Sequence, residues 1–298
     1  MDHREFNLLR LHAIPGVRWR TIHRIFRILE ERGETLEDFF HATQETWRKV
    51  FRLPGPVVEH LAHRSPEIDR LAFEWQVGLT PLRARVLSES HPAYPDRVRS
   101  FFETPPPILY WIGDLEAFPI HRWVAWVSSR TLTSQGQRIL SDLVDRIPKL
   151  PTSIGVVSSF YRPVYRRIAR ASLAAHRPIL LVPDRGFLQV RNSPLMKMRH
   201  EQTWIVSPFA PDDVGTGGSG PKRDQMLVAL SDKVVGLEIR AGGVMERVLQ
   251  QALQKSKTVW VYQPPYPTTS NEGNFHLLAQ GARPFRDLQD LWGSLLAS

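Results

Sequence analysis

Hydroxyl and guanidinium groups follow an apolar run of strand length in the middle of the chain. The run Trp123–Val127 continues into the segment 128–131, SSRT, and a helical pattern begins near Thr133. In a doubly wound sheet, ligands bind beyond the carboxyl ends of strands, where a helix N-terminus favours an anion. The hydroxyl of Thr133 or Ser134 would equally serve as a plain helix cap. The guanidinium of Arg130 favours an anion site, with phosphate as the natural ligand.

Two similar phrases near the N-terminus suggest a second way of holding phosphate. Ile14–Val17 (IPGV) and Leu53–Pro56 (LPGP) lie between segments with helical apolar spacing, which predicts paired hairpins between short helices. Glycine turns of this kind can hold a phosphate through backbone N–H groups without reading a base. The alternative is a purely structural or protein-docking turn. The residues singled out are Pro15, Gly16, Arg18, Arg20, Pro54 and Gly55.

Other chemical motifs are weak or missing. Residues 215–220, GTGGSG, satisfy G-x-G-x-x-G, but prolines and aspartates precede them where a dinucleotide fold needs a strand, so we interpret them as a flexible loop. His60 and His63 share a helix face without a third ligand, which favours a solvated face over a metal site. No hydrolase, NTPase or metalloprotease motif occurs. We therefore predict a non-enzymatic protein with no cofactor and no metal.

Composition and charge limit the classes of partner and the cellular location that we expect. The 298 residues include 39 lysines and arginines against 30 aspartates and glutamates, a formal net charge of +9, which fits a polyanion such as nucleic acid. The absence of cysteine excludes disulfides and thiolate ligands. No apolar run reaches ~18 residues and the N-terminus is too charged for a secretory signal, so we expect a cytoplasmic protein without a membrane partner.

The elements that must position these residues change character along the chain. The first 75 or so residues alternate short helical patterns with turns. Later, near-continuous apolar runs alternate with amphipathic helices, as strands covered on both faces require. The runs are Trp123–Val127, Ile154–Val157, Ile179–Val182, Trp204–Val206, Val234–Ile239 and Val259–Tyr262. The pattern predicts an α/β fold, a Rossmann-like doubly wound and mainly parallel sheet, preceded by a small all-α helix-hairpin-helix (SAM-like) domain.

Domain boundaries follow from the same change of pattern. We predict a helix-hairpin-helix domain over residues 1–78 and a Rossmann domain over 79–298. Within the latter, residues 79–121 crowd prolines around aromatics and are expected to form a lead-in linker that packs against the sheet.

Several segments, in order, carry the motifs of one family. These are His91–Pro95 with Pro105–Tyr110, similar to "YP..L......PP..LY"; Val127–Thr133, similar to "VGSR..T"; Pro221–Gln225 and Ala229–Ser231, similar to "P.RNR" and "AGLS"; and Gly273–Asn274 with Gly281–Pro284, similar to "GN.LI..GA.PV". Together they resemble the DprA/Smf family, which binds incoming single-stranded DNA and hands it to the RecA recombinase. The resemblance covers nearly the whole chain.

The departures from that family concern its pocket. Residues 158–169, SSFYRPVYRRIA, stand where the family has "SG.A.GID..AH", so the glycines, the aspartate and the histidine are lost. Bulk at Phe160 and Pro163 is expected to narrow a nucleotide-sized pocket. Ser128 replaces the first motif glycine, and Asp224 and Gln225 replace the last two residues of "RNR".

The resemblance implies a single-stranded DNA-binding homodimer that assists a RecA-type recombinase. We expect the DNA along the carboxyl-terminal edge of the sheet, with affinity that falls with salt. The expected contacts are Ser129, Arg130, Arg162, Lys222, Arg223 and Asn274. Two alternatives stay open: a nucleotide or nucleotide-sugar sensor similar to the LOG-type hydrolases, with Glu238 as its polar group, and a scaffold subunit that has lost its ligand.

Overall fold

The computed structural model describes residues 2–118 and 121–296. The described helices are α1 His3–Ala13, α2 Trp19–Arg32, α3 Leu36–His41, α4 Gln44–Lys49, α5 Gly55–His63, α6 Ser65–Leu79, α7 Asp96–Phe101, α8 Ser134–Arg146, α9 Pro163–Ala174, α10 Phe187–Val190, α11 Pro194–Lys197, α12 Ser219–Leu230, α13 Val244–Gln254, α14 Glu272–Ala279 and α15 Leu288–Leu296. None of them is both long and apolar enough to cross a membrane.

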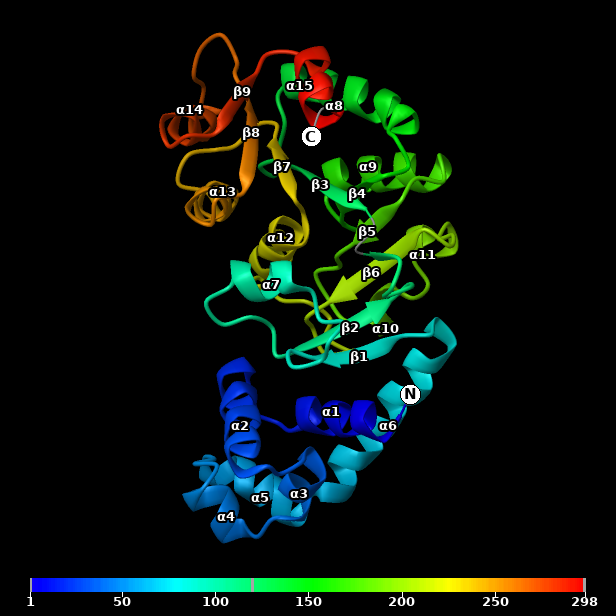
Figure 1. The fold of residues 1–298 in the computed structure, drawn as a ribbon, viewed down its shortest axis with the longest axis vertical. Coiled ribbons are helices and arrows are strands. Elements are labelled where there is room, and N and C mark those ends of the chain that lie inside the picture. The colour runs from blue at the N-terminus through cyan, green and yellow to red at the C-terminus, as the bar shows by residue number, and fades with distance from the viewer. Residues whose placement is uncertain (1, 119–120, 297–298) are drawn as a thin grey trace.

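A sheet of mainly parallel strands follows the helical region α1–α6 (Figure 1). Its strands are β1 Arg85–Ser88, β2 Ile108–Ile112, β3 Arg122–Val127, β4 Ile154–Ser158, β5 Ile179–Leu181, β6 Thr203–Ser207, β7 Lys233–Gly236, β8 Thr258–Tyr262 and β9 Arg283–Phe285. In the described part of the chain their order is β1-β2-β6-β5-β4-β3-β7-β8-β9. All six predicted strands are present as β3–β8, and the predicted fold class is confirmed.

The lead-in segment differs from the expected linker. Instead of lying over the sheet, β1 and β2 form an antiparallel hairpin, and β2 then pairs antiparallel with β6. The aromatic residues Tyr110 and Trp111 are buried because they belong to a strand that is covered on both faces. The segment therefore extends the sheet and supplies the surface against which the helical region packs.

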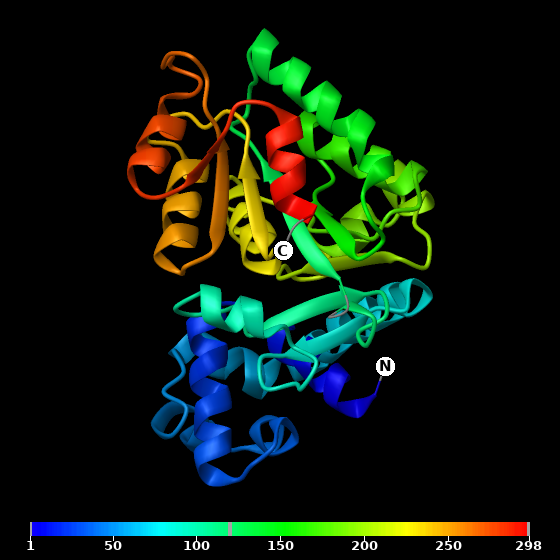
Figure 2. The ribbon, with the colours of Figure 1, turned by 45° about the horizontal axis from the view of Figure 1, so that its top comes forward.

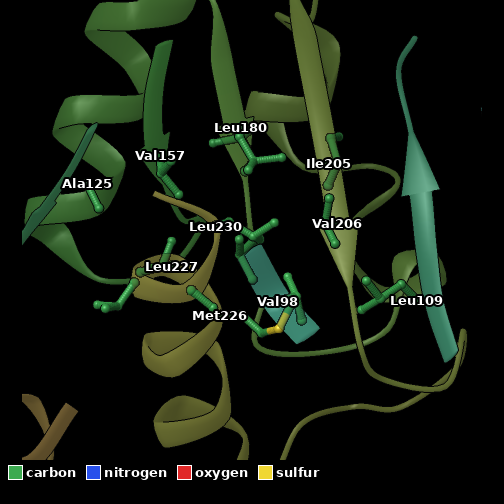
Figure 3. Packing of buried hydrophobic residues seen from close by; sticks show 14 of the residues in the cluster. Val98, Leu109, Ala125, Val157, Leu180, Ile205, Val206, Met226, Leu227 and Leu230 are labelled. Atoms are coloured by element: carbon green, nitrogen blue, oxygen red, sulfur yellow. The ribbon is translucent and has the colours of Figure 1, made fainter. Parts of the chain in front are cut away.

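Helices cover the sheet on both faces (Figure 2). The crossovers β3–α8–β4 and β4–α9–β5 place their helices on one face, whereas α12, α13 and α14 follow later strands on the other. Figure 3 shows apolar side chains of α12 and α7 lying against those of the strands. The packed residues include Val98, Leu109, Ala125, Val157, Leu180, Ile205, Met226, Leu227 and Leu230. Near-continuous apolarity of the parallel strands reflects this double cover.

Polar contacts fasten the helical region to the β1–β2 hairpin. Glu5 of α1 accepts a hydrogen bond from the Arg85 guanidinium at 2.6 Å. His23 of α2 lies 3.0 Å from the Glu89 carboxylate and 2.7 Å from the Pro105 carbonyl oxygen. Because these contacts come from both α1 and α2, the first helical hairpin is held in a fixed place beside the sheet.

His12 forms the central aromatic contact of this junction. Its ring stacks on that of Tyr110, with centroids 5.8 Å apart, and its Nδ1 atom hydrogen-bonds with the Tyr110 hydroxyl at 2.7 Å. Burial, and secondly the positive charge of Lys222, lowers the pKa of the His12 imidazole to about 4. The neutral ring is therefore the form that fits the folded protein.

Acid should weaken the protein through this histidine. Between pH 6.5 and 4 the unfolded chain binds a proton at His12 that the folded chain does not, so stability falls as pH falls, by on the order of 3 kcal/mol in all. The variant His12→Gln should lose less stability than wild type between pH 7 and about pH 4.5 in urea denaturation. Burial also lowers the pKa of His91, His121 and His200, so some pH dependence will persist.

The exposed His63 of α5 provides the control, because His63→Gln should leave the wild-type pH dependence in place. An identical loss of stability in His12→Gln and wild type on acidification would contradict this account.

Asn274 joins three elements at the carboxyl end of the sheet. Its side-chain amide donates to the carbonyl oxygens of Leu237 and Tyr262 at 2.7 and 2.6 Å, and its Oδ1 atom accepts from the Ile239 N–H at 2.7 Å. The side chain is fully buried. It therefore ties the segments after β7 and β8 to the first turn of α14.

Truncation of this side chain should be costly. Asn274→Ala leaves three buried backbone groups without partners, so we expect a loss of about 2–4 kcal/mol in the free energy of unfolding. Denaturant titration of Asn274→Ala beside the exposed-residue control Asn192→Ala measures it. If the free energies of unfolding of the two variants differed by less than about 0.5 kcal/mol, the usual range of surface substitutions, the structural role of Asn274 would be refuted.

Candidate nucleic-acid interface

The candidate site lies where the direction of the sheet connections reverses. Strand β3 sits between β4 and β7, and the chain moves away from it in opposite directions in its first and second halves. The loops that leave β3 and β7 therefore diverge, and a crevice forms outside the carboxyl ends of the strands. The hollow there has a volume of about 550 Å³. It is lined by Ser129, Arg130, Thr131, Arg240, Ala241, Thr269, Ser270 and Glu272.

Backbone hydrogen bonds hold the two arginine-bearing loops together. The Ser129 N–H donates to the Glu238 carbonyl oxygen at 2.8 Å, and the Arg240 N–H donates to the Ser129 hydroxyl at 2.7 Å. The side chains of Arg130 and Arg240 are exposed and make no ion pair or hydrogen bond within the described ranges. Two guanidinium groups on fixed backbones are thus free to bind an anion.

Arg240 was not among the sequence-predicted contacts. Like Arg130, it follows closely on a buried apolar run, here Val234–Ile239. The same signal that identified Arg130 would have identified Arg240, had every parallel strand been examined for the polar residue beyond its carboxyl end.

The N-terminus of α8, expected to attract a phosphate, already holds an anion. The buried Glu238 carboxylate accepts from the Thr133 N–H at 2.7 Å and also from the Thr133 hydroxyl. Gly136 makes room for it, because a Cβ atom there would lie 2.5 Å from the Glu238 Oε2 atom. The Thr133 hydroxyl in turn accepts from the Gly136 N–H as an ordinary helix cap. The anion bound at the N-terminus of α8 is therefore a carboxylate of the protein itself, and Glu238 does not face a ligand.

Arg223 is placed away from the surface, contrary to the sequence-based prediction. Its side chain is 1% exposed, and its guanidinium lies 2.8 Å from the Asp224 carboxylate and 3.6 Å from that of Asp184. Burial, the largest single effect, acts to lower the pKa of Arg223, but Asp224, Tyr165 and Asp184 together outweigh it and raise the pKa. The guanidinium neutralises protein carboxylates and does not reach a ligand at the rim.

Arg162 belongs to the same internal network. Its guanidinium lies 3.3 Å from Asp224 Oδ2, and its side chain is 25% exposed. Tyr165 donates its hydroxyl hydrogen bond to Asp224 Oδ1, and burial raises the pKa of Tyr165. Asp224 thus engages both arginines, so only part of Arg162 is available at the edge.

The residues that replaced the family's glycine turn fill the space beside this network. Phe160 is buried after β4, and Tyr161 beside it is half-buried. The guanidinium of Arg185 lies over the Tyr161 ring, 4.0 Å from its centroid. Aromatic and ionic groups of the protein itself now occupy the region where glycines would leave a pocket.

Lys222 connects the sheet edge with the helical region. It is exposed in the first turn of α12, and its ammonium lies 4.8 Å from the ring centroid of Trp19 at the start of α2. The sequence placed this lysine and the first hairpin in separate sites, yet the fold brings them into contact.

The hairpin residues lie on the surface of the helical region. Gly16 adopts a left-handed φ of 82° in the turn between α1 and α2, which a glycine permits. Pro15, Gly16, Arg18, Arg20, Pro54 and Gly55 are all exposed. A Cβ atom on Gly16 would lie 3.4 Å from Val57 of α5, so the two hairpins pack side by side.

Asn274, by contrast, is withdrawn from the predicted interface. Its side-chain polar atoms bind backbone groups of the segment after β7 and of the last residue of β8, and none of its surface is exposed. The sequence-based assignment of Asn274 as a DNA contact is therefore corrected to a structural role.

Comparisons with known proteins agree with this architecture. The family profile described as DNA recombination-mediator protein A matches residues 85–296. No curated protein matches the chain by sequence.

Two solved structures share the fold. DNA processing protein A (DprA) from Streptococcus pneumoniae superposes with a TM-score of 0.75 at 16% identity, covering 98% of each chain. The single-stranded DNA-binding DNA processing protein A from Helicobacter pylori gives a TM-score of 0.58 at 20% identity, covering 72% of this chain and 97% of the other.

The profile match spans well over half of the chain, including the three segments that line the hollow, and confirms the resemblance seen in the sequence motifs. The chain belongs to the DNA recombination-mediator protein A (DprA) family.

Proposed function

We propose that this protein binds single-stranded DNA along the carboxyl edge of its sheet and acts by binding, not by catalysis. The observation that carries the proposal is the pair of unpartnered arginines, Arg130 and Arg240, in a hydroxyl-lined hollow at the switch point of the sheet. The structural relative from H. pylori is a single-stranded DNA-binding protein, which supports the same ligand class here.

The chemistry of the hollow suits the sugar-phosphate backbone. Guanidinium groups bind phosphate oxygens through paired N–H donors, and the hydroxyls of Ser129, Thr131 and Thr269 add further donors. Among the described residues, Glu272 is the only carboxylate that lines the hollow. Such contacts position a strand without reading its sequence.

Further groups along the edge extend the proposed path. Lys222 and the exposed part of Arg162 add positive charge, and half-buried Tyr161 offers a ring on which a base can stack. From the family resemblance we further propose a cytoplasmic homodimer that assists a RecA-type recombinase, with the helical hairpins as a secondary backbone contact.

A nucleotide sensor is less well supported by the geometry. The Glu238 carboxylate occupies the N-terminus of α8, where a nucleotide phosphate would bind in a related fold, and Phe160 fills the neighbouring turn. The residue expected to recognise the nucleotide instead repels its phosphates.

Removal of both free arginines should weaken DNA binding. Arg130→Gln with Arg240→Gln should lower the affinity for oligothymidylate by about tenfold or more, and should reduce the slope of log K against log salt by about 1.4, the effect of two lost phosphate contacts. Fluorescence anisotropy at several salt concentrations measures both quantities.

The matched control removes the same charge from the opposite edge of the sheet. Arg122 and Arg283 are exposed at the first residues of β3 and β9, so Arg122→Gln with Arg283→Gln should change affinity far less. Equal losses in the two double variants would show that net charge, and not the hollow, determines binding.

Nucleotides should not bind in a saturable way. Because Glu238 supplies the anion at α8, titration calorimetry with AMP, ATP and NAD at millimolar concentrations should give no heat beyond dilution. A stoichiometric isotherm would support the sensor and would require Glu238 to leave its helix.

A further inference from the structure

A second cluster of arginines surrounds a hollow in the helical region. The hollow has a volume of about 340 Å³ and lies between α2 and the turn that joins α4 to α5. Its lining residues are Arg24, Arg27, Ile28, Glu31, Arg32, Val50 and Arg52. Four guanidinium groups against one carboxylate make it strongly cationic.

The charges of this hollow are only partly balanced. Arg32 pairs with Glu34 at 2.6 Å, and Arg27 lies 3.7 Å from Glu31. Arg24 and Arg52 form no ion pair and no side-chain hydrogen bond within residues 2–118 and 121–296. The Nε atom of Arg24 is buried from solvent without a hydrogen-bond partner. A buried donor left without a partner is uncommon and calls for an explanation.

The backbone at Arg52 supplies an independent observation. Arg52 adopts a φ of 52°, in the left-handed region that non-glycine residues seldom enter. This residue lies directly before the second proline-glycine turn, and its exposed side chain lines the hollow. The N–H of the next residue, Leu53, donates to the Trp47 carbonyl oxygen at 3.0 Å, so this conformation closes the C-terminal turn of α4 and fixes the Arg52 backbone beside the hollow.

The row of positive charge leading to the hollow begins at the sheet. Lys222 of α12 contacts Trp19, the first residue of α2. From there Arg20, Arg24 and Arg27 follow at spacings of four and three residues, so they share one side of the helix and cover about 10 Å along its axis. The cationic edge of the sheet and the arginine hollow are thus connected along α2.

We propose that the hollow binds the sugar-phosphate backbone of the same single strand that the sheet edge holds. DNA leaving the edge passes Lys222 and Trp19, follows α2, and places phosphate between Arg24 and Arg52. Paired guanidinium groups match phosphate oxygens, whereas the apolar lining, Ile28 and Val50, offers no ring for a base. The contact is therefore independent of sequence, and it rests on the proposed function of the sheet edge.

The test compares two lengths of DNA. Fluorescence anisotropy is measured with oligothymidylates of about 6 and about 20 nucleotides, so that only the longer one can reach both sites. Arg24→Gln with Arg52→Gln should weaken binding of the long strand about five- to tenfold and reduce its salt slope by about 1.4, as expected for two lost contacts. Binding of the short strand should not change, which also shows that the variant is folded.

A matched control removes two other arginines of the helical region. Arg64 and Arg70 are exposed and lie near Glu67 and Glu74, at 3.9 and 4.0 Å. Arg64→Gln with Arg70→Gln should leave the long strand bound as in wild type. The charge-retaining variant Arg24→Lys with Arg52→Lys should recover most of the salt slope and part of the affinity.

The outcomes separate this inference from the proposed function. If wild type binds both lengths of DNA and Arg24→Gln with Arg52→Gln binds the long strand equally well, the inference is overturned and the proposed function still stands. Failure of wild type to bind either length overturns both.

Competition identifies the ligand class. Inorganic phosphate and a polyglutamate peptide are each titrated against wild type and the Arg24→Gln, Arg52→Gln variant. We expect neither to displace the long strand at concentrations comparable to DNA phosphate. Tight polyglutamate binding that depends on Arg24 and Arg52 would mean that the hollow binds an acidic protein. Tight phosphate binding that depends on the same two arginines would mean that the hollow binds a free anion. Either result overturns the inference.

Discussion

The carboxylate of Glu238 at the N-terminus of α8 is the interaction on which the candidate interface depends. It neutralises the partial positive charge of the helix end, a contribution of up to about 2 kcal/mol in buried geometries, and it fixes Thr133 at the start of that helix. The Glu238 carbonyl also receives the Ser129 N–H, so one residue joins the loop after β3 to the loop after β7. Because the Glu238 carboxylate already occupies the N-terminus of α8, the exposed arginines that line the hollow are the groups left to meet an anion.

Beside β4 and β5, a buried network of arginines and aspartates occupies the space near the sheet edge with the protein's own charged groups. In the segment that stands in place of the family's glycine turn, Phe160 and Tyr161 occupy the space beside β4, and the buried charge of Arg223 requires carboxylates nearby. Asp224 and Asp184 meet that need. Desolvation makes such a network a weak source of stability, yet removal of one partner would leave an uncompensated buried charge. Burial alone therefore requires that Arg223 and Asp224 stay paired, whether or not DNA binds nearby.

The sequence predicted the parts of the fold that depend on local pattern. Strands β3–β8 were recognised because parallel strands covered on both faces read as continuous apolar runs. The pattern predicts a linker where β1 and β2 lie, because prolines 105–107 precede β2. It does not predict β9, because this edge strand has only three residues and contains a proline. The place of Arg130 after a strand predicts it as a contact, and its side chain lines the hollow at that edge. The burial of Arg223 is not predicted, because Asp184 lies far away in sequence and approaches it only through the sheet crossovers.

Under the proposed function, recognition of single-stranded DNA should depend on the DNA backbone more than on the bases. Where glycines would let the backbone of the protein approach a base closely, bulky side chains now stand, so the discriminating contacts of a deep pocket are lost. What remains exposed is guanidinium, ammonium and hydroxyl groups on the loops at the sheet edge and along α2. Their attraction for phosphate is long-ranged and tolerant of position, and the net charge of +9 strengthens it over the whole surface. Under the proposed function, affinity rises with the number of phosphates engaged in parallel, and the contact between Lys222 and Trp19 is the point at which the proposed DNA path passes from the sheet edge to α2.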